Sequence, residues 1–465
     1  MADLADTDME LRRRLVSALG REAILDTPDD LLAYACDALV DAPPPVVVVL
    51  PRSAADVAMT VRIAASFERS ITARGAATGM TGGAVAVPGG ILLSTVRMNH
   101  ILEIDPAHRR ARVQPGVVTL DLTYAAAPYG LFFAPDPASE RICTIGGNFA
   151  TNAAGPHAFA YGATAEQVLA IEYVDASGDI RQSNLDDGGI DVCSILAGSE
   201  GTLGIVTCLD VRLRKAPESI CIGVASFPDL ESAIEASTAI RERCTAVVAL
   251  ELLDELALMA IAATSTSPYP RNAKAVLLIE FAGLLEDTRE SEDRAEALVR
   301  RYAADSWVST HTVAEAQRLW SGRHDVRKAL SRISPDLMVC DLAVPRSRLV
   351  QAVRAIAAIA KQHRLRCSTV GHLGDGGLHP ILLYDRTDID ENAAVESASN
   401  EMLEAMLTLG GGAGEYGIGF TKREIVYQQR DATDRAALHR LHHALDPQQR
   451  FNPEKLLPPR ELEHA

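Results

Sequence analysis

Two histidines and a glutamate in the last third of the chain have side chains that divalent metals bind. His372 and His379 begin and end the glycine-rich run HLGDGGLH, and Glu415 follows beyond a helical stretch. Two imidazoles and one carboxylate suit Zn²⁺ or Mn²⁺ and leave coordination positions open for a substrate. Histidines at this spacing can converge on a turn and a strand, whereas a pair on a helix needs positions i and i+4. Taken alone, the three residues leave open both a metal centre and a structural pair of histidines.

Glycine-rich loops gather in the first half of the chain, next to strand-like runs. A run such as Thr78–Gly83 lets backbone N–H groups converge on a phosphate, because glycine permits close approach and positive φ. One such loop alone is typical of an ordinary turn. Several of them together indicate a site for an extended dinucleotide, and they lie at 74–83, 115–116, 135–137, 146–148 and 198–204.

The residues between these loops predict the elements that hold them. Val46–Leu50 is typical of a buried strand, and Ser53 with Asp56 predicts the capping box of a helix. An amphipathic helix is expected over 9–19. Beyond residue 219 glycine becomes sparse, and expected strands alternate with expected helices, the strands at 220–225 and 275–281 and the helices at 231–242, 287–303 and 348–363.

This change in glycine content and in the pattern of expected elements predicts how the chain divides into domains. We expect an N-terminal helical segment over 1–41 and a glycine-rich cofactor-binding domain over 42–218. A second α+β domain, which carries the candidate metal ligands, is expected over 219–432. Residues 433–465 are expected to pack back onto an earlier domain.

Composition excludes several classes of function. The 465 residues include 62 acidic and 45 basic side chains, so the net charge of −17 repels nucleic acid and anionic membrane surfaces. No apolar run approaches the roughly 20 residues that span a bilayer, and the N-terminus does not resemble a signal peptide. The eight cysteines form no Cys-x-x-Cys motif, which argues against an iron–sulfur cluster in this chain and favours a cytoplasmic location.

Two further patterns invite a functional interpretation that their context does not favour. Residues 412–417, GAGEYG, match G-x-G-x-x-G, but that motif needs a preceding strand, and here a helical stretch over 393–409 comes first. His439, His442 and His443 share one face of an expected helix, where a solvated surface is favoured over a second metal site.

Four stretches of this sequence together resemble a known family. RGAATGMTGG at 74–83, APDP at 134–137, IGGNFATNAAG at 145–155 and GSEGTLG at 198–204 are similar to the FAD-binding domain of the vanillyl-alcohol oxidase and p-cresol methylhydroxylase (PCMH) superfamily. Within it, the chain resembles the FAD-linked subunit of bacterial glycolate oxidase and the D-lactate and D-2-hydroxyglutarate dehydrogenases. The similarity runs from about Pro45 to Pro459.

The resemblance implies an α+β fold and an FAD cofactor. We expect a PCMH-type FAD-binding domain of two subdomains, an α+β cap domain with helices on an antiparallel sheet, and a C-terminal segment that returns to the FAD domain. Covalent members often carry a histidine in the first glycine loop, and residues 74–83 contain none, so FAD is expected to be non-covalent. The residues expected to bind it are Arg74, Gly75, Ala76, Thr78, Gly79, Thr81, Gly82, Gly83, Pro115, Gly116, Pro135, Asp136, Gly146, Gly147, Asn148, Asn152, Gly198, Glu200, Gly201, Gly204, Ile205 and Asn452.

The resemblance also assigns His372, His379 and Glu415 as ligands of a divalent metal, Zn²⁺ or Mn²⁺. Two positions depart from the family. Gly377 replaces an asparagine, and Tyr416 replaces the histidine thought to act as the base. A phenol has an ordinary pKa of about 10, against about 6.5 for imidazole, so Tyr416 is a weak base at neutral pH.

Three residues are expected to serve catalysis. By resemblance Arg323 clamps the substrate carboxylate, which a bidentate guanidinium suits, although Arg323 and Arg327 could also line a solvated helix face. Tyr416 is the weak candidate base, and Lys422 matches a family lysine whose role we leave open. The D-2-hydroxyglutarate enzymes carry a lysine just before the position of Asp341, which 338–340 lack, and this favours a short monocarboxylate.

Together these features predict an FAD-dependent oxidation of a small D-2-hydroxy acid, glycolate or D-lactate. The electrons are expected to leave through a separate acceptor, such as an iron–sulfur subunit, oxygen or a quinone, in a homo- or hetero-oligomer. Three alternatives stay open. One is a flavoenzyme of the same fold that acts on another hydroxylated metabolite or catalyses alkyl transfer. The others are a catalytically impaired subunit of a larger dehydrogenase and a nicotinamide-dependent enzyme.

Overall fold

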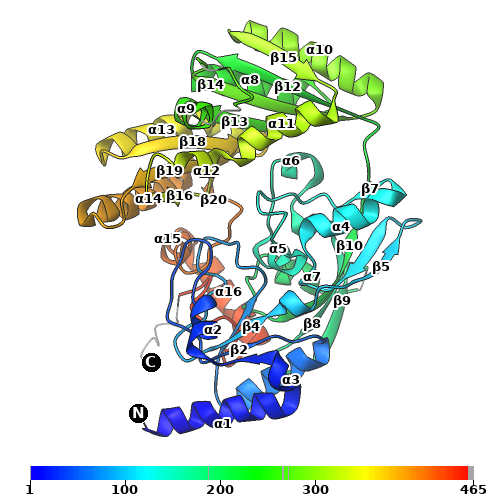
Figure 1. Cartoon of the computed structure of the whole chain (residues 1–465), viewed down its shortest axis with the longest axis vertical. Helices are drawn as coiled ribbons and strands as arrows, with labels where there is room; N and C mark the ends of the chain where they lie inside the picture. The colour runs from blue at the N-terminus through cyan, green and yellow to red at the C-terminus, as the bar shows by residue number, and fades with distance from the viewer. Residues whose placement is uncertain (1, 187, 264–266, 271, 459–465) are drawn as a thin grey trace. The chain divides into compact units, whose positions relative to one another are not determined.

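The computed structural model describes residues 2–186, 188–263, 267–270 and 272–458 (Figure 1). The chain divides into two compact units, each made of segments that are distant in the sequence. Unit 1 comprises Met1–Ala154, Gly162–Ala216 and Tyr416–Ala465, and unit 2 comprises Gly155–Tyr161 and Pro217–Glu415. None of the described helices combines the length and the hydropathy needed to cross a bilayer.

The first sheet of unit 1 is largely parallel. Its strands lie in the order β1-β2-β4-β3, with β2–β4 and β4–β3 parallel and β1–β2 antiparallel. Helix α3 (Ala54–Ser66) begins at the predicted capping box of Ser53 and Asp56 and packs on α1 (Ala2–Leu19), which starts seven residues before the helix predicted over 9–19. The strands are β1 (Ile24–Leu25), β2 (Val47–Val49), β3 (Ile71–Arg74) and β4 (Ile91–Ser94).

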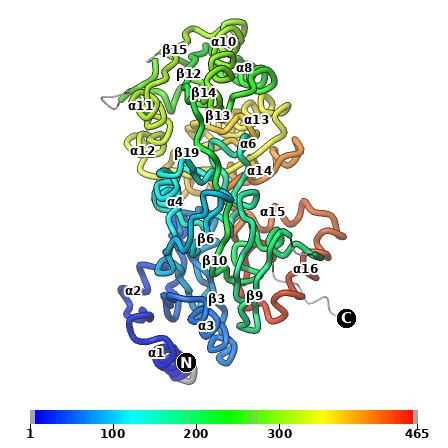
Figure 2. Tube along the Cα trace, turned by 90° about the vertical axis from the view of Figure 1, so that its right-hand side faces the viewer, coloured from blue at the N-terminus to red at the C-terminus, as the bar shows by residue number. Residues whose placement is uncertain are grey.

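The second sheet of unit 1 is antiparallel throughout. Its strands lie in the order β5-β6-β10-β8-β9, with β9 and β10 traceable in Figure 2. Short helices complete its core, among them α4 (Thr119–Ala126) and α5 (Ile145–Thr151). The strands are β5 (Ile101–Asp105), β6 (Arg110–Val113), β8 (Val168–Val174), β9 (Ile180–Asn184) and β10 (Ile205–Arg212).

The C-terminal segment returns to unit 1, as predicted. After α15 (Arg423–Gln428) and α16 (Ala432–Leu445), Phe451 forms a parallel bridge with Ile71 of β3. The N–H of Asn452 then donates to the carbonyl of Ile71 at 2.7 Å. The segment around Phe451 and Asn452 therefore lies on the first sheet of unit 1.

Unit 2 is built on one large antiparallel sheet. Among the described residues it has nine strands in the order β15-β12-β14-β13-β18-β19-β17-β20, with β16 beside β19, and every pairing is antiparallel. The strands are β12 (Ser219–Phe227), β13 (Val247–Asp254), β14 (Ala275–Gly283), β15 (Ser306–Thr310), β16 (Asp336–Val339), β17 (Leu342–Ala343), β18 (Arg366–His372), β19 (Gly377–Tyr384) and β20 (Gly412–Ala413).

Helices cover this sheet, so the α+β class predicted from the sequence is confirmed. Helices α8, α10, α13 and α14 contact one another in a chain and pack on strands of the sheet (Figure 1). Helices α9, α11 and α12 enclose a separate core that contains Ile222, Leu278 and Val370. Their bounds are α8 (Leu230–Arg243), α9 (Glu255–Ala262), α10 (Leu285–Arg301), α11 (Val313–His324), α12 (Val326–Leu330), α13 (Leu349–Gln362) and α14 (Ile389–Thr408).

Candidate metal and flavin sites

The structure brings the three predicted metal ligands together in unit 2. His372 ends β18 and His379 lies on β19, where Val370 is its register partner, so the two histidines are diagonal neighbours on one face of a hairpin. Glu415 follows β20, and its Oε1 lies 3.5 Å from Nε2 of His372 and 3.6 Å from Nε2 of His379. One ligand atom from each residue lies within 4.8 Å of the others, so the donor set fits a divalent cation.

The hairpin turn between the two histidines requires glycine at one position. Gly376 has φ +95°, and a Cβ there would stand 2.0 Å from the carbonyl oxygen of Val344. A side chain at this position would therefore push the turn away from the segment after β17. The predicted spacing of the histidines depends on this tight turn, because it places their strands in register.

A carboxylate that the sequence analysis missed orients the first histidine. Glu251 of β13 is the register partner of His372, and its Oε1 lies 2.6 Å from Nδ1 of that histidine. This contact leaves Nε2 of His372 on the side of Glu415. A signal was present in the sequence, since Glu251 interrupts the apolar run VVALELL of a buried strand, and a buried charge needs a partner.

The same carboxylate also holds the predicted substrate-binding arginine. Nε of Arg323, near the end of α11, lies 2.8 Å from Oε2 of Glu251, and the Arg323 side chain is only 10% exposed. Arg323 therefore does not line a solvated helix face. It lies one carboxylate away from the histidine of the metal site.

A second buried carboxylate positions Glu415. Oδ1 of Asp341 accepts the backbone N–H of Glu415 at 2.9 Å, and the Asp341 carbonyl accepts the N–H of Gly414 at 3.1 Å. A Cβ on Gly414 would stand 2.1 Å from Oδ1 of Asp341, so only glycine lets the chain come this close. No pattern in the sequence pointed to this role of Asp341, whose position marked only the expected size of the substrate.

The two histidines differ in their electrostatic surroundings. Burial by itself would lower the pKa of His372, but the charge of Glu251 and its hydrogen bond, together with Glu415, raise that pKa well above its ordinary value. Burial and the neighbouring His372 lower the pKa of His379 to about 4. Burial opposes ionisation of Glu251 as well, yet His372 and Arg323 hold the pKa of this carboxyl below its usual value. These surroundings thus favour a neutral His379 and an ionised Glu251 at neutral pH.

In unit 1 the structure brings several predicted flavin-binding loops together. The side-chain Nδ2 of Asn452 donates to the carbonyls of Gly83 at 2.8 Å and of Glu200 at 2.7 Å, which joins loops 74–83 and 198–204. A Cβ on Gly75 would stand 2.4 Å from Oγ1 of Thr144, and the N–H of Gly146 donates to Pro115. The strand-to-helix loops at 75, 115–116 and 144–147 therefore also meet.

The first glycine loop keeps an open side. A Cβ added at Gly79 would meet nothing within 4 Å, whereas Gly82 has φ +78° in the left-handed region. Gly198 and Gly201 of the neighbouring loop have φ +72° and +71°. A loop that is open at Gly79 fits a dinucleotide, because glycine lets a phosphate approach the backbone closely.

Other predicted flavin-binding residues use their polar groups inside the protein. Nη1 of Arg74 donates to the carbonyl of Cys36 at 2.7 Å, and Nδ2 of Asn148 donates to Thr119 at 2.8 Å. Oδ1 of Asn152 accepts the N–H of Ala165, and the carboxylate of Glu200 accepts the N–H groups of Ile418 and Gly419. Their roles toward FAD remain predictions. Of the remaining predicted residues, Ala76, Thr78, Thr81, Gly116, Gly147, Gly204 and Ile205 lie in or next to the same loops, whereas Pro135 and Asp136 lie in the segment that follows β7 (Leu131–Phe132).

The two other predicted catalytic residues belong to unit 1. The carbonyl of Tyr416, which directly follows Glu415, accepts from Oγ1 of Thr81 at 3.4 Å. Lys422 is the N-cap residue of α15, and its N–H donates to the carbonyl of Ile418 at 3.2 Å. The pattern GAGEYG at 412–417 follows α14, as predicted, and so lacks the preceding strand of a dinucleotide-binding motif. His439 on α16 is hydrogen-bonded to Tyr427 at 2.8 Å.

Fold and site together define a flavin-dependent oxidoreductase. The chain belongs to the FAD-linked oxidases: residues 45–184 match the family model described as the FAD binding domain, and residues 216–456 match the model of the FAD linked oxidases, C-terminal domain. FAD is therefore its cofactor, bound through the N-terminal domain.

Curated relatives match nearly the whole chain. It is 35% identical over 440 residues to the glycolate oxidase subunit GlcD of Escherichia coli (strain K12), covering 94% of this chain and 88% of that protein. It is 35% identical to GlcD of Bacillus subtilis (strain 168), covering 96% of each, and 30% identical to the D-2-hydroxyglutarate dehydrogenase of Stutzerimonas stutzeri (strain A1501), covering 97% and 99%.

Solved structures support the fold. The structure of p-cresol methylhydroxylase with substrate bound has a TM-score of 0.82 and 17% sequence identity, and the match covers 97% of each chain. At this identity the likeness concerns the fold alone. The predicted membership of the PCMH superfamily is confirmed.

Glu251→Gln is expected to weaken divalent metal binding at His372, His379 and Glu415 by about 10- to 100-fold, because the amide no longer orients and polarises the histidine. Binding can be followed as the loss of the electron paramagnetic resonance signal of free Mn²⁺ during titration. Glu280→Gln is a matched control, since Glu280 is a buried carboxylate on the adjacent strand β14 that accepts from Trp320 Nε1. Equal Mn²⁺ affinity of wild type and Glu251→Gln would contradict the orienting role.

Proposed function

We propose that the protein oxidises a small D-2-hydroxy acid, glycolate or D-lactate, to the 2-oxo acid with non-covalent FAD as acceptor and a Zn²⁺ or Mn²⁺ ion as a helper. The observation that carries this proposal is the shared carboxylate of Glu251. It contacts His372 of the metal site and Arg323 at the same time. A 2-hydroxy acid carries a hydroxyl and a carboxylate on adjacent carbons. The hydroxyl suits a metal ion held by His372, and the carboxylate suits Arg323.

Arg323 supplies the recognition of the substrate carboxylate. Its Nε is engaged by Glu251, so the substrate would bind the terminal N–H groups of the fork. The guanidinium is nearly buried, so Arg323 needs little reorganisation of its own when it binds a carboxylate. The pairing with Glu251 also fixes the direction in which the fork points.

His372, His379 and Glu415 would hold the divalent cation. The cation, when bound, lowers the pKa of a hydroxyl that it contacts. FAD, when bound, accepts the hydride from the substrate carbon. The proton of the hydroxyl must leave to a base or to water, and Tyr416 occupies the position of the family's histidine.

The charge near Asp341 supports a substrate with one carboxylate. Residues 336–339 form β16 and Cys340 follows, and none of the positions 338–340 is a cation. A second carboxylate would need a partner when desolvated. This favours glycolate or D-lactate over D-2-hydroxyglutarate.

The electrons are proposed to pass to a separate acceptor. The eight cysteines form no Cys-x-x-Cys motif that would suit an iron–sulfur centre, and none of them is in a disulfide in the described structure. The similarity to a protein described as a glycolate oxidase subunit favours an iron–sulfur partner subunit. Oxygen or a quinone are the other acceptors, and a cytoplasmic, oligomeric assembly remains a prediction.

Anaerobic mixing of the purified flavoprotein with D- and L-hydroxy acids tests this function. Glycolate or D-lactate is expected to bleach the oxidised flavin absorbance within a turnover, whereas L-lactate and D-2-hydroxyglutarate leave it yellow. Glyoxylate or pyruvate should appear in equal amount. If every short hydroxy acid leaves the flavin oxidised, a different hydroxylated substrate or another reaction class is indicated.

Arg323→Ala is expected to lower kcat/KM for the best substrate by on the order of 100-fold, because a desolvated charge pair is lost. The flavin content should stay unchanged, since FAD is assigned to the other unit. Arg327→Ala serves as the matched control, because Arg327 lies on the following short helix α12 and is exposed, whereas Arg323 is buried. Equal losses in both variants would remove Arg323 from substrate recognition.

Two variants of Tyr416 can distinguish an active enzyme from a catalytically impaired subunit. With an active enzyme, Tyr416→Phe keeps the rate of flavin bleaching within a few-fold, since a phenol is mostly protonated at neutral pH. Tyr416→His is then expected to raise that rate modestly. Bleaching that appears only in Tyr416→His would support the impaired-subunit alternative, and its loss in Tyr416→Phe would identify the phenol as the base.

A further inference from the structure

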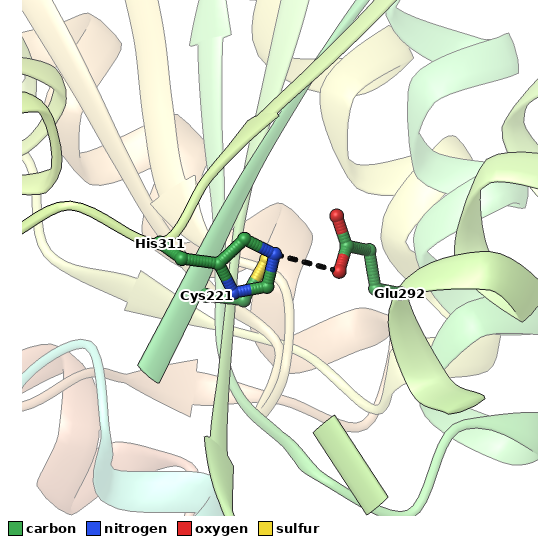
Figure 3. Close-up of side chains that lie close together, drawn as sticks. All are labelled: Cys221, Glu292 and His311. Carbon is green, nitrogen blue, oxygen red and sulfur yellow. Dashed lines mark ion pairs between the residues drawn. The ribbon is translucent and has the colours of Figure 1, made fainter. Parts of the chain in front are cut away.

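A second group of metal-binding side chains lies elsewhere in unit 2. Cys221 is on β12, Glu292 is on α10, and His311 directly follows β15 (Figure 3). Ile222 pairs with Thr310 in the antiparallel ladder, so Cys221 and His311 occupy the next cross-strand position. Helix α10 packs on β12 and brings Glu292 to the same place.

The three side chains converge closely. Nε2 of His311 lies 3.0 Å from Oε2 of Glu292, which Figure 3 marks with a dashed line. One ligand atom from each of the three residues lies within 4.8 Å of the others. On a tetrahedral Zn²⁺ the ligand atoms stand about 3.3 to 3.8 Å apart, given bond lengths of about 2.0 and 2.3 Å. Binding would therefore need side-chain shifts of only about 1 Å.

Solvent exposure increases from the Cys221 sulfur to His311. Cys221 is fully buried, the Glu292 side chain is 15% exposed, and the His311 side chain is 47% exposed. An ion can thus enter from the His311 side and meet the thiol beneath. A larger substrate cannot reach the covered sulfur, so a nucleophilic cysteine is not supported. A His–Glu pair at the surface stabilises little by itself and does not explain the third donor.

This group is separate from His372, His379 and Glu415. Side chains alternate along a strand, and the register pairs Glu251 with Leu278 of β14 and Glu280 of the same strand with Ile222. Glu251, Leu278, Glu280 and Ile222 therefore share one face of the sheet. Cys221 points to the other face, toward α10.

We propose that Cys221, Glu292 and His311 form a Zn²⁺ site, distinct from the metal site of the proposed reaction. A thiolate and an imidazole favour Zn²⁺ over Mg²⁺ and Ca²⁺, which prefer oxygen ligands. On binding, the Cys221 thiol releases its proton to solvent and forms the sulfur–zinc bond. With the carboxylate of Glu292 and the neutral imidazole, the two negative ligands balance the charge of the ion, and water completes the tetrahedron.

The ion would tie three elements at one end of the sheet. Strand β15 is the last strand of the order, with β12 as its neighbour, and α10 covers this end. A bond from each of the three elements to one ion holds them in register. The site is thus structural in character and independent of substrate oxidation.

X-ray absorption at the zinc edge tests the site in the intact flavoprotein. The ligand set of the other metal site contains no sulfur, so a sulfur shell at about 2.3 Å reports the proposed site alone. We expect this shell in zinc-loaded wild type and its loss in Cys221→Ser. Cys244→Ser is the matched control, because Cys244 is also buried in unit 2 and lies outside the group. A wild type that lacks the sulfur shell at saturating zinc would overturn the proposal.

Two surface variants cover the case in which Cys221→Ser does not fold. Glu292→Gln and His311→Gln are each expected to lower zinc affinity at the sulfur-containing site by about tenfold or more, because each removes one ligand. Zinc should also raise the unfolding temperature of wild type more than that of either variant, with flavin reduction by substrate unchanged in all three. A sulfur shell that persists in both variants, with undiminished zinc affinity, would show that the metal is held elsewhere.

Discussion

The arrangement of the candidate metal site depends on a single buried carboxylate. Glu251 has no exposed surface, and an unpaired charge in such a position would cost several kcal/mol. His372 hydrogen-bonds one of its oxygens, and Arg323 forms an ion pair with the other. One side chain therefore contacts both the imidazole of His372 and the guanidinium of Arg323.

This contact lies at a narrow join in the sheet. Strands β13 and β18 share only two register pairs, Glu251 with His372 and Leu252 with Gly371, whereas β12 and β14 share nine. The join connects the part of the sheet under α8 and α10 to the hairpin that carries the histidines. A slip by one residue would turn Glu251 to the other face and leave its charge unpaired. The polar contact thus specifies the register where few backbone pairs do so.

The sequence predicted what local patterns encode. The capping box of Ser53 and Asp56 forms as predicted, and His372 and His379 lie close together on a hairpin, as their spacing allows, because these partners are close along the chain. The family resemblance supplied Glu415 and Arg323. Glu251 could not be assigned to His372, since their pairing joins residues 121 positions apart and depends on the register of the whole sheet.

The predicted flavin-binding loops illustrate a related limit. A motif predicts that loops 74–83 and 198–204 meet, but not which atoms hold them together. Asn452 and Glu200 use their side chains to join these loops and the turn at 418–419. The N-terminal helix was predicted too short for a similar reason, because its first residues, ADLADTDM, have no apolar periodicity of their own.

The two groups of metal-binding side chains lie at different places in one sheet, and their surroundings differ. The two histidines of the first group lie on strands flanked on both sides, and buried carboxylates orient His372 and Glu415. The second lies at the outer strand β15, whose Val308 is 57% exposed and whose outer edge has no partner strand in the described sheet. Edge strands are the places where sheets fray or pair wrongly. An ion that joins β15, β12 and α10 would secure the end from which the register of β13, and with it the position of Glu251, is built up strand by strand.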